Sequence, residues 1–371
     1  MTANLSSQAV KQRLLSLDFL RGLIMTVLLL GETGFFQRLH MAFENPFTEA
    51  LSRQFAHSSW HGLRFWDTVL PAFMMVAGTA MAFSYNKQVK SGYSWGQSFV
   101  KMLKRCFWLM FWGVMIYAVK GNELNLEFTN VLTELSFAAF VTFLLIRLPF
   151  KYQLVISIMI LILTELLFRF TNIAGFDQPF VDKHNFGSYI DLLLLGRVNG
   201  HTTTMNWIPC SVSTIWGMMA GQLLLSAKKE KSKISLLMGF GGLSLAAGLI
   251  LDVSGITPML KWISSSSFVM VNGGISLIAL AICYYWIDVR KKQRNLKFFT
   301  IVGMNSIFIY LFFNFVGLKW MNRYIDILVS GLLNKIAIPV EVGSAIGCLV
   351  VFAIEWGVCY FLYKKKLFFK L

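Results

Sequence analysis

The sequence has few charged residues. Asp, Glu, Lys and Arg make up only 14% of the 371 residues, and hydrophobic residues make up 56%. A soluble globular domain usually has about a quarter charged residues. The composition therefore excludes an ordinary soluble domain, and the long apolar runs predict an all-α, polytopic membrane protein.

The sequence also lacks several common signatures of chemistry. It contains no Walker phosphate loop, no glycine-rich dinucleotide fingerprint and no well-spaced cluster of metal ligands. His57 and His61 would share one face of a helix, but no third ligand is near them, so we expect no metal. The net charge of +16 comes from short basic clusters between apolar runs, as in cytoplasmic loops. We therefore expect no nucleic-acid partner.

Cysteines and domain boundaries are scarce as well. The five cysteines lie in or beside apolar runs, which is typical of small buried hydrophobic residues. No linker, low-complexity tract or fixed-period repeat divides the chain, so we predict one membrane domain over residues 1–371. Asp18 and Arg21 interrupt the first apolar run and no small-residue cleavage site follows. We therefore expect that run to stay in the mature protein.

Ten apolar runs are long enough to cross about 30 Å of hydrocarbon. They lie near 14–34, 62–85, 102–119, 128–147, 152–170, 206–227, 234–251, 267–288, 298–318 and 341–363. Most of the 34 Lys and Arg residues lie at the two chain ends and in alternate loops. These runs predict about ten transmembrane helices, and the positive-inside rule predicts that both termini are cytoplasmic. We expect the protein in the cell (inner) membrane.

The stretch from His57 to Tyr85 places titratable groups at the start of the second span. His57 and His61 precede the span, and Asp67 lies just inside it. Ionisable groups at this depth are costly and point to function. The alternative is that the histidines are interfacial loop residues and Asp67 pairs with an arginine. Glu32 ends the first span on the same side, so either Glu32 or Asp67 is placed to orient His57.

Other polar residues lie within or beside the apolar runs. Asp18 and Arg21 are three residues apart and share a helix face. Either they neutralise each other, or Arg21 binds a phosphate of a cytosolic ligand. The asparagines within the runs join helices or line a polar pocket. Three glutamates without a sequence partner favour a transporter as the alternative. These intramembrane amides and carboxylates are Asn206, Asn272, Asn305, Glu134, Glu165 and Glu355.

Six motifs in a fixed order carry a resemblance to a known family. They are S-L-D-F-L-R-G (Ser16–Gly22), H-S-S-W-H-G-L-R-F-W-D-T-V-L-P (His57–Pro71), S-Y-I-D-L-L-L-L-G (Ser188–Gly196), W-G-M-M-A-G (Trp216–Gly221), W-I-S-S-S-S-F-V (Trp262–Val269) and V-G-M-N-S-I-F-I-Y (Val302–Tyr310). Together they resemble the heparan-α-glucosaminide N-acetyltransferase family of the transmembrane acyltransferase superfamily, particularly its bacterial branch. The stretch from His57 to Pro71 is the most specific of the six.

The resemblance implies an acetyl-CoA-dependent transferase with His57 as its active-site residue. Acetyl-CoA would enter from the cytosol, and the acceptor would be an amino sugar or glycan on the outer side. His57 would act as a base or as an acyl-accepting nucleophile. The residues we assign on this basis are His57, Asp67 and Glu32 for catalysis, Arg21, Asp18, Asn272, Asn305 and Ser267 for acetyl-CoA, and Trp60, His61, Asp191 and Asn206 for the acceptor.

Two differences from the family pattern concern the acceptor. Where the family has Asp-Pro-Glu-Gly, this chain has Asn206-Trp-Ile-Pro, and Glu32 stands where human-type enzymes have asparagine. A carrier or flippase of a sugar or acylated substrate is the alternative function, and a scaffold without chemistry is a third. The resemblance also allows a homodimer.

Overall fold

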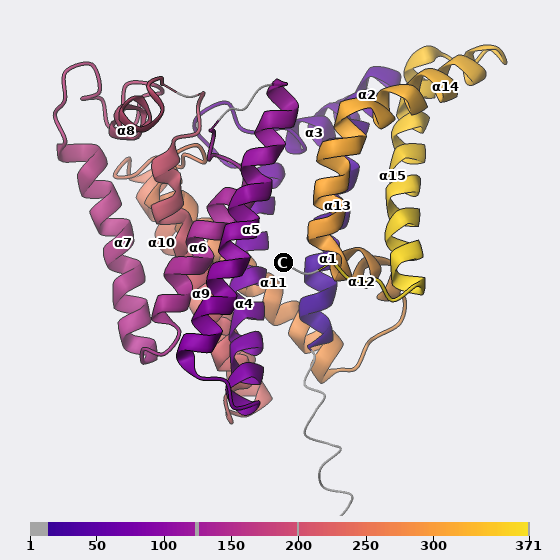
Figure 1. The fold of residues 1–371 in the computed structure, drawn as a ribbon. Coiled ribbons are helices and arrows are strands. Elements are labelled where there is room, and N and C mark those ends of the chain that lie inside the picture. The colour runs from indigo at the N-terminus through magenta and orange to yellow at the C-terminus, as the bar shows by residue number, and fades with distance from the viewer. Residues whose placement is uncertain (1–13, 123–125, 199, 370–371) are drawn as a thin grey trace, which may run out of the picture.

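The computed structural model describes residues 14–122, 126–198 and 200–369. These residues form helices and connecting loops, and no β-strand occurs among them. The predicted all-α class is confirmed. Figure 1 shows most of the long helices running side by side, with α8, α3, α2 and α14 at one end of the bundle.

The elements follow one another along the chain with short loops between most of them. They are α1 (Leu15–Glu32), α2 (Phe35–Ala42), α3 (Pro46–Gln54), the 3-10 helix η1 (Phe65–Thr68), α4 (Val69–Lys90), α5 (Trp95–Gly121), α6 (Val131–Leu145), α7 (Phe150–Phe170), α8 (Phe186–Leu195), η2 (Thr204–Asn206), α9 (Trp207–Leu225), α10 (Glu230–Val253), α11 (Ser266–Cys283), the π-helix η3 (Tyr284–Val289), α12 (Lys297–Met304), α13 (Ser306–Phe312), the π-helix η4 (Phe313–Met321), α14 (Asn322–Asn334) and α15 (Val340–Lys364).

Each of the ten predicted spans coincides with a helix or a bent group of helices. Seven described helices are long and apolar enough to cross a membrane, and two bent pairs raise the number to nine. The chain turns by 50° between α1 and α2 and by 74° between α12 and the helix that starts at Ser306. The remaining predicted span is α6, which has only 15 residues. The protein is a multi-pass membrane protein, while the number ten and the cytoplasmic side of the termini stay predictions.

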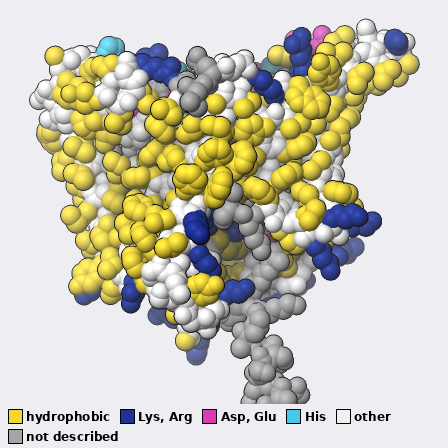
Figure 2. Space-filling model, viewed as in Figure 1, with side chains coloured by type: hydrophobic (Ala, Val, Ile, Leu, Met, Phe, Trp, Pro, Cys, Tyr) yellow, Lys and Arg dark blue, Asp and Glu magenta, His cyan; other side chains and the backbone are white. Residues whose placement is uncertain are grey.

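Burial separates the central helices from the peripheral ones. We compared the most apolar stretch of 18 residues in each helix. The buried share of this stretch is 72% in η2–α9, 61% in α11–η3 and 56% in η1–α4, but only 28% in α7 and 17% in α10. A helix that is apolar on its exposed side suits a lipid environment. Figure 2 shows the matching surface, a hydrophobic band with Lys and Arg side chains mainly toward its two ends.

Helices α4 and α9 pack closely because each presents glycine to the other. A Cβ atom at Gly78 would lie 2.0 Å from the carbonyl oxygen of Thr214, and one at Gly217 would lie 2.1 Å from that of Met75. Only glycine allows this backbone approach, which is common between membrane helices. The hydroxyl of Thr79 also donates to the carbonyl of Gly217 at 2.9 Å. The contact fixes α4, the helix that begins beside Asp67.

The length of α4 separates His57 from a basic loop. The helix has 22 residues, so it extends about 33 Å at 1.5 Å per residue. His57 lies in the loop before η1, and Lys87 and Lys90 lie in the last turn of α4. The imidazole and this basic end therefore lie at opposite ends of a helix long enough to span a bilayer.

Candidate active site

His57 and Asp67 form a hydrogen-bonded pair at the start of α4. The Asp67 side chain is fully buried in η1, and its Oδ1 lies 2.9 Å from Nδ1 of His57. Its Oδ2 accepts the backbone N–H groups of Ser58 at 3.2 Å and Arg64 at 3.0 Å. One carboxylate thus binds both ends of the loop that carries His57. It holds the ring in place while the imidazole stays 43% exposed.

An arginine supports this loop without pairing with Asp67 through its side chain. Nη1 of Arg64 donates to the backbone carbonyl of His57 at 2.7 Å. The cation beside Asp67 is Lys261, whose Nζ lies 3.5 Å from Oδ1. The expected alternative, an Asp67–arginine ion pair, does not occur in the described part of the chain.

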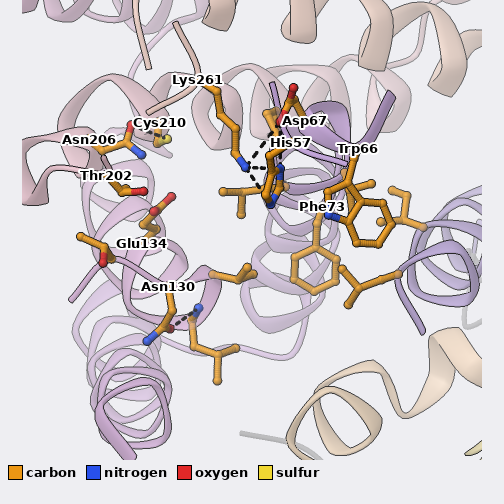
Figure 3. Close-up of a pocket in the computed structure, with 18 of the residues that line it drawn as sticks. His57, Trp66, Asp67, Phe73, Asn130, Glu134, Thr202, Asn206, Cys210 and Lys261 are labelled. Atoms are coloured by element: carbon orange, nitrogen blue, oxygen red, sulfur yellow. Dashed lines mark hydrogen bonds and ion pairs between the residues drawn. The ribbon is translucent and has the colours of Figure 1, made fainter. Parts of the chain in front are cut away.

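Lys261 is the third member of the cluster and comes from the loop before α11. Its Nζ lies 2.5 Å from Nδ1 and 3.1 Å from Nε2 of His57. Burial of the side chain lowers the pKa of Lys261 to about 8, although Asp67 opposes this shift. The amine can therefore change its charge near neutral pH. Figure 3 shows Lys261, His57 and Asp67 converging from separate segments.

Backbone contacts bring Lys261 to the histidine loop. His61 and Leu260 form an isolated antiparallel bridge, and the N–H of Gly62 donates to the carbonyl of Met259 at 2.9 Å. The indole N–H of Trp262 donates to the carbonyl of Ser59 at 2.9 Å, and its ring meets the His57 ring edge-on at 5.5 Å. The two loops form one unit around the imidazole.

A cavity of about 290 Å³ lies beside this cluster. His57, Asp67 and Lys261 line it together with two further carboxylates, Glu32 and Glu134. Glu32 ends α1 and makes no hydrogen bond with His57 within the described residues, so Asp67 is the carboxylate that contacts the ring. Lys120 lines the cavity as well, so it contains a histidine, two lysines and three carboxylates.

A second cavity, of about 570 Å³, adjoins the first. Phe73, Ser306 and Ile307 line both cavities. Arg21 and Arg105 line the second cavity, and one Arg21 nitrogen lies 3.8 Å from Asp18. Nε of Arg105 is buried and has no hydrogen-bond partner in the described ranges. Two guanidinium groups thus line a space that continues toward His57.

One of the predicted asparagines lines a cavity, and a second holds a segment that lines the other. Asn206 lines the first cavity, and its Oδ1 accepts from the thiol of Cys210 at 3.3 Å. Asn305 lies at the bend between α12 and α13. Its Nδ2 donates to the carbonyl of Leu367 at 3.1 Å, and its Oδ1 accepts from the N–H of Phe369 at 3.0 Å. Asn305 therefore fixes the C-terminal segment, which forms part of the second cavity wall.

The other predicted binding residues lie outside the walls of both cavities. Asn272 donates to Phe268 within its own helix, and the Ser267 hydroxyl lies 3.1 Å from that of Ser265. The remaining three stabilise loops. Trp60 donates to the carbonyl of Phe180, His61 pairs with Asp252 at 2.8 Å, and Asp191 accepts the N–H of Thr204 at 2.8 Å.

Sequence reasoning missed Lys261, Trp66, Trp262 and Arg105 as site residues. Lys261 directly precedes one of the six motifs, and it is a basic residue in a loop on the side opposite the basic clusters, which is a usable signal. Arg105 was one of several basic residues in a predicted cytoplasmic cluster. Trp66 packs against the end of α1, where a Cβ atom at Gly31 would lie 2.3 Å from its ring. No group of three or more metal-binding side chains occurs in the ranges that the structure describes.

Comparison with known proteins gives one result. The sequence model described as "Heparan-alpha-glucosaminide N-acetyltransferase, catalytic" matches residues 13–251, well over half of the chain. The matched range includes Arg21, Glu32, His57, Asp67 and Glu134, and it ends before Lys261. No curated protein matches the chain.

Proposed function

The chain belongs to the heparan-α-glucosaminide N-acetyltransferase family, and we propose that it transfers an acetyl group from cytosolic acetyl-CoA to an amino sugar or glycan on the outer side of the cell (inner) membrane. The observation that carries this proposal is the pair of adjoining cavities, one with His57 and one with two arginines. Their arrangement suits a long donor that enters at one end and reacts at the other.

The second cavity is the proposed site for acetyl-CoA. A guanidinium matches the geometry of a phosphate and can bind it through two hydrogen bonds. Arg21 and Arg105 would hold the phosphates, and Asp18 would orient Arg21. The pantetheine arm would then pass Phe73 and Ser306, which line both cavities. Asn305 would contribute to acetyl-CoA binding indirectly, because it holds the C-terminal segment that lines this cavity.

The first cavity is the proposed site of acetyl transfer. With its Nδ1–H bound by Asp67, His57 has a lone pair on Nε2 that can accept a proton. The acceptor amine attacks the thioester carbonyl, so that a C–N bond forms and the C–S bond breaks. The amine proton passes to His57 and then to the departing thiolate, which leaves as CoA. In the alternative route, Nε2 attacks first and an acetyl-imidazole forms.

Proteoliposomes test the proposal directly. The lumen contains acetyl-CoA labelled in its acetyl group, and the external buffer contains glucosamine. We expect labelled N-acetylglucosamine outside and free CoA inside. General-base catalysis typically contributes about 10²–10⁴-fold, so His57→Ala should lose that much transfer and still bind acetyl-CoA. His184→Ala is the control, because His184 is exposed and contacts the carbonyl of Gly175 instead.

The same experiment separates an enzyme from a carrier. A carrier would move intact labelled substrate and leave no covalent product on glucosamine. Transfer that persists at the wild-type rate in His57→Ala would show that the imidazole does not act in the reaction.

A further inference from the structure

Glu134 is a buried carboxylate that the proposed mechanism does not use. It lies in the first turn of α6, its residue is 2% exposed, and it lines the same cavity as His57. Its Oε2 is buried and has no hydrogen-bond partner among the residues that the structure describes. Burying a carboxylate without a partner is costly, so such a group requires a cation or a proton.

The start of α6 holds Glu134 in position. The Asn130 side chain accepts the N–H groups of Leu132 at 3.0 Å and Thr133 at 3.2 Å, and it donates to the carbonyl of Gly113 at 2.8 Å. These bonds fix the first turn of α6 against α5. The backbone at Glu134 is thereby fixed, and its buried side chain lies at the cavity.

The surroundings of Glu134 are polar. Figure 3 shows Glu134, Thr202, Asn206 and Cys210 on one side of the cavity, with His57 and Lys261 across from them. The thiol of Cys210 contacts Asn206 at 3.3 Å and the hydroxyl of Ser264 at 2.9 Å. Amide, hydroxyl and carboxylate groups on one wall are suited to a small polyhydroxylated ligand that carries a positive charge.

Lys261 is not the cation that Glu134 requires. Its Nζ lies within 3.5 Å of both His57 and Asp67, and no ion pair joins it to Glu134 in the described part of the chain. Glu134 therefore shares its wall of the cavity with neutral groups such as the Cys210 thiol, and no ion pair reaches it within the described residues. A ligand between the two walls would place its ammonium at Glu134 and remain within reach of His57.

We propose that Glu134 binds the ammonium group of the acceptor and makes the cavity selective for a primary amine over a hydroxyl. The inference rests on the proposed function and assigns the acceptor end of the same site. Glu134 stabilises the cationic amine before reaction. The ammonium first gives one proton to Nε2 of His57, and the neutral amine forms the new C–N bond as the C–S bond breaks. The second amine proton goes to the departing thiolate, which leaves as CoA, and His57 then releases its proton to solvent.

Binding without acetyl-CoA tests Glu134 apart from the chemistry. The probes are glucosamine and glucose, which differ only in the amine. Quenching of tryptophan fluorescence reports binding to the purified full chain, because Trp66 and Trp262 line the cavity. A hydrogen bond to a charged group contributes enough for about a tenfold or larger preference. We expect this preference for glucosamine in the wild type and its loss in Glu134→Gln.

Two further variants control the comparison. Glu355→Gln changes another buried intramembrane glutamate outside this cavity and should keep the preference. Glu134→Asp keeps the charge and should retain a reduced preference. The inference is wrong if the wild type does not distinguish the two sugars, if Glu134→Gln still does, or if Glu134→Asp behaves like Glu134→Gln while remaining folded.

Measuring transfer in the same samples keeps the two proposals separate. If the wild type prefers glucosamine through Glu134 but never acetylates it, the proposed amine site stands and the proposed transferase activity is wrong. If Glu134→Gln acetylates glucosamine with the same KM for glucosamine as the wild type, the proposed amine site is wrong and the proposed transferase activity stands.

Discussion

Nζ of Lys261 lies 2.5 Å from Nδ1 of His57, the ring nitrogen that also lies 2.9 Å from Asp67. Nδ1 carries at most one proton in the neutral ring, so it cannot donate to Asp67 and accept from Lys261 at once. When Lys261 is an ammonium and donates to Nδ1, the ring proton must be on Nε2. When Lys261 is neutral, Nδ1–H can donate to Asp67, and Nε2 has a free lone pair. An ammonium can only donate whereas a neutral amine can also accept, so the charge of Lys261 biases the tautomer of His57.

Transfer should rise with pH as Lys261 loses its proton. Burial lowers the pKa of Lys261 to about 8, so the amine is cationic below pH 8 and neutral above it. We expect kcat to increase through this range in the wild type and to lose this step in Lys261→Met. The measurement is kcat from pH 6 to pH 9.5 for both proteins. The titration of the acceptor amine is common to both, so the difference between the profiles reports Lys261, and identical profiles would contradict the prediction.

Replacing the carboxylate of Asp67 should reverse the hydrogen bond to His57. In Asp67→Asn the side-chain amide can donate to Nδ1, which forces the proton onto Nε2 and removes the base. We expect kcat to fall about 10²–10⁴-fold with little change in the KM for acetyl-CoA. Steady-state kinetics and thermal unfolding check this together. Asp326→Asn, which alters an ion pair with Arg38 outside both cavities, should keep its activity.

Arg105 should matter only for donors that carry phosphates. A hydrogen bond to a charged group contributes about 1.5–3 kcal/mol, which corresponds to roughly a 10–150-fold change in affinity. We therefore expect Arg105→Gln to raise the KM for acetyl-CoA at least tenfold and to leave that for acetyl-pantetheine unchanged. Arg169→Gln is the matched control, because Arg169 pairs with Glu165 at 2.8 Å outside both cavities. An equal loss with both donors would exclude phosphate binding by Arg105.

A single methyl group should loosen the α4–α9 contact. The Cβ atom in Gly217→Ala would lie 2.1 Å from the carbonyl oxygen of Met75, so the helices must move apart. Overpacking of this kind costs about 1–3 kcal/mol. We expect a lower unfolding midpoint in detergent. Gly239→Ala meets no atom within 4 Å and should be neutral or stabilising. Equal midpoints for the two variants would show that the helices tolerate the extra atom.

The sequence predicted the helices and one half of the site. Hydrophobic length alone located the runs that form the bundle, and the start of an apolar span marked His57 and Asp67, only ten residues apart. The bends were not predicted, because they depend on local geometry. At the first bend, Gly34 directly precedes α2 with φ of +79°, in the left-handed region that favours glycine.

The other half of the site comes from distant segments. Lys261 is 204 residues from His57, and only the contact between the loops at His61 and Leu260 brings it to the ring. Not every residue of the motifs lines the site, as Trp60, His61 and Asp191 show. Their side chains hold loops together, and a motif does not distinguish a residue that shapes a site from one that lines it.

Because Asn305 holds Leu367 and Phe369, the C-terminal segment forms part of the wall of the proposed acetyl-CoA cavity. The same segment contributes Phe368 and Phe369 to the wall around Arg21 and Arg105. Trimming the chain by five residues would remove both aromatic rings and leave Asn305, at the 74° turn, without its main-chain bonds. Proteolysis or a bulky fusion at this end should therefore weaken the binding of acetyl-CoA without unfolding the helix bundle.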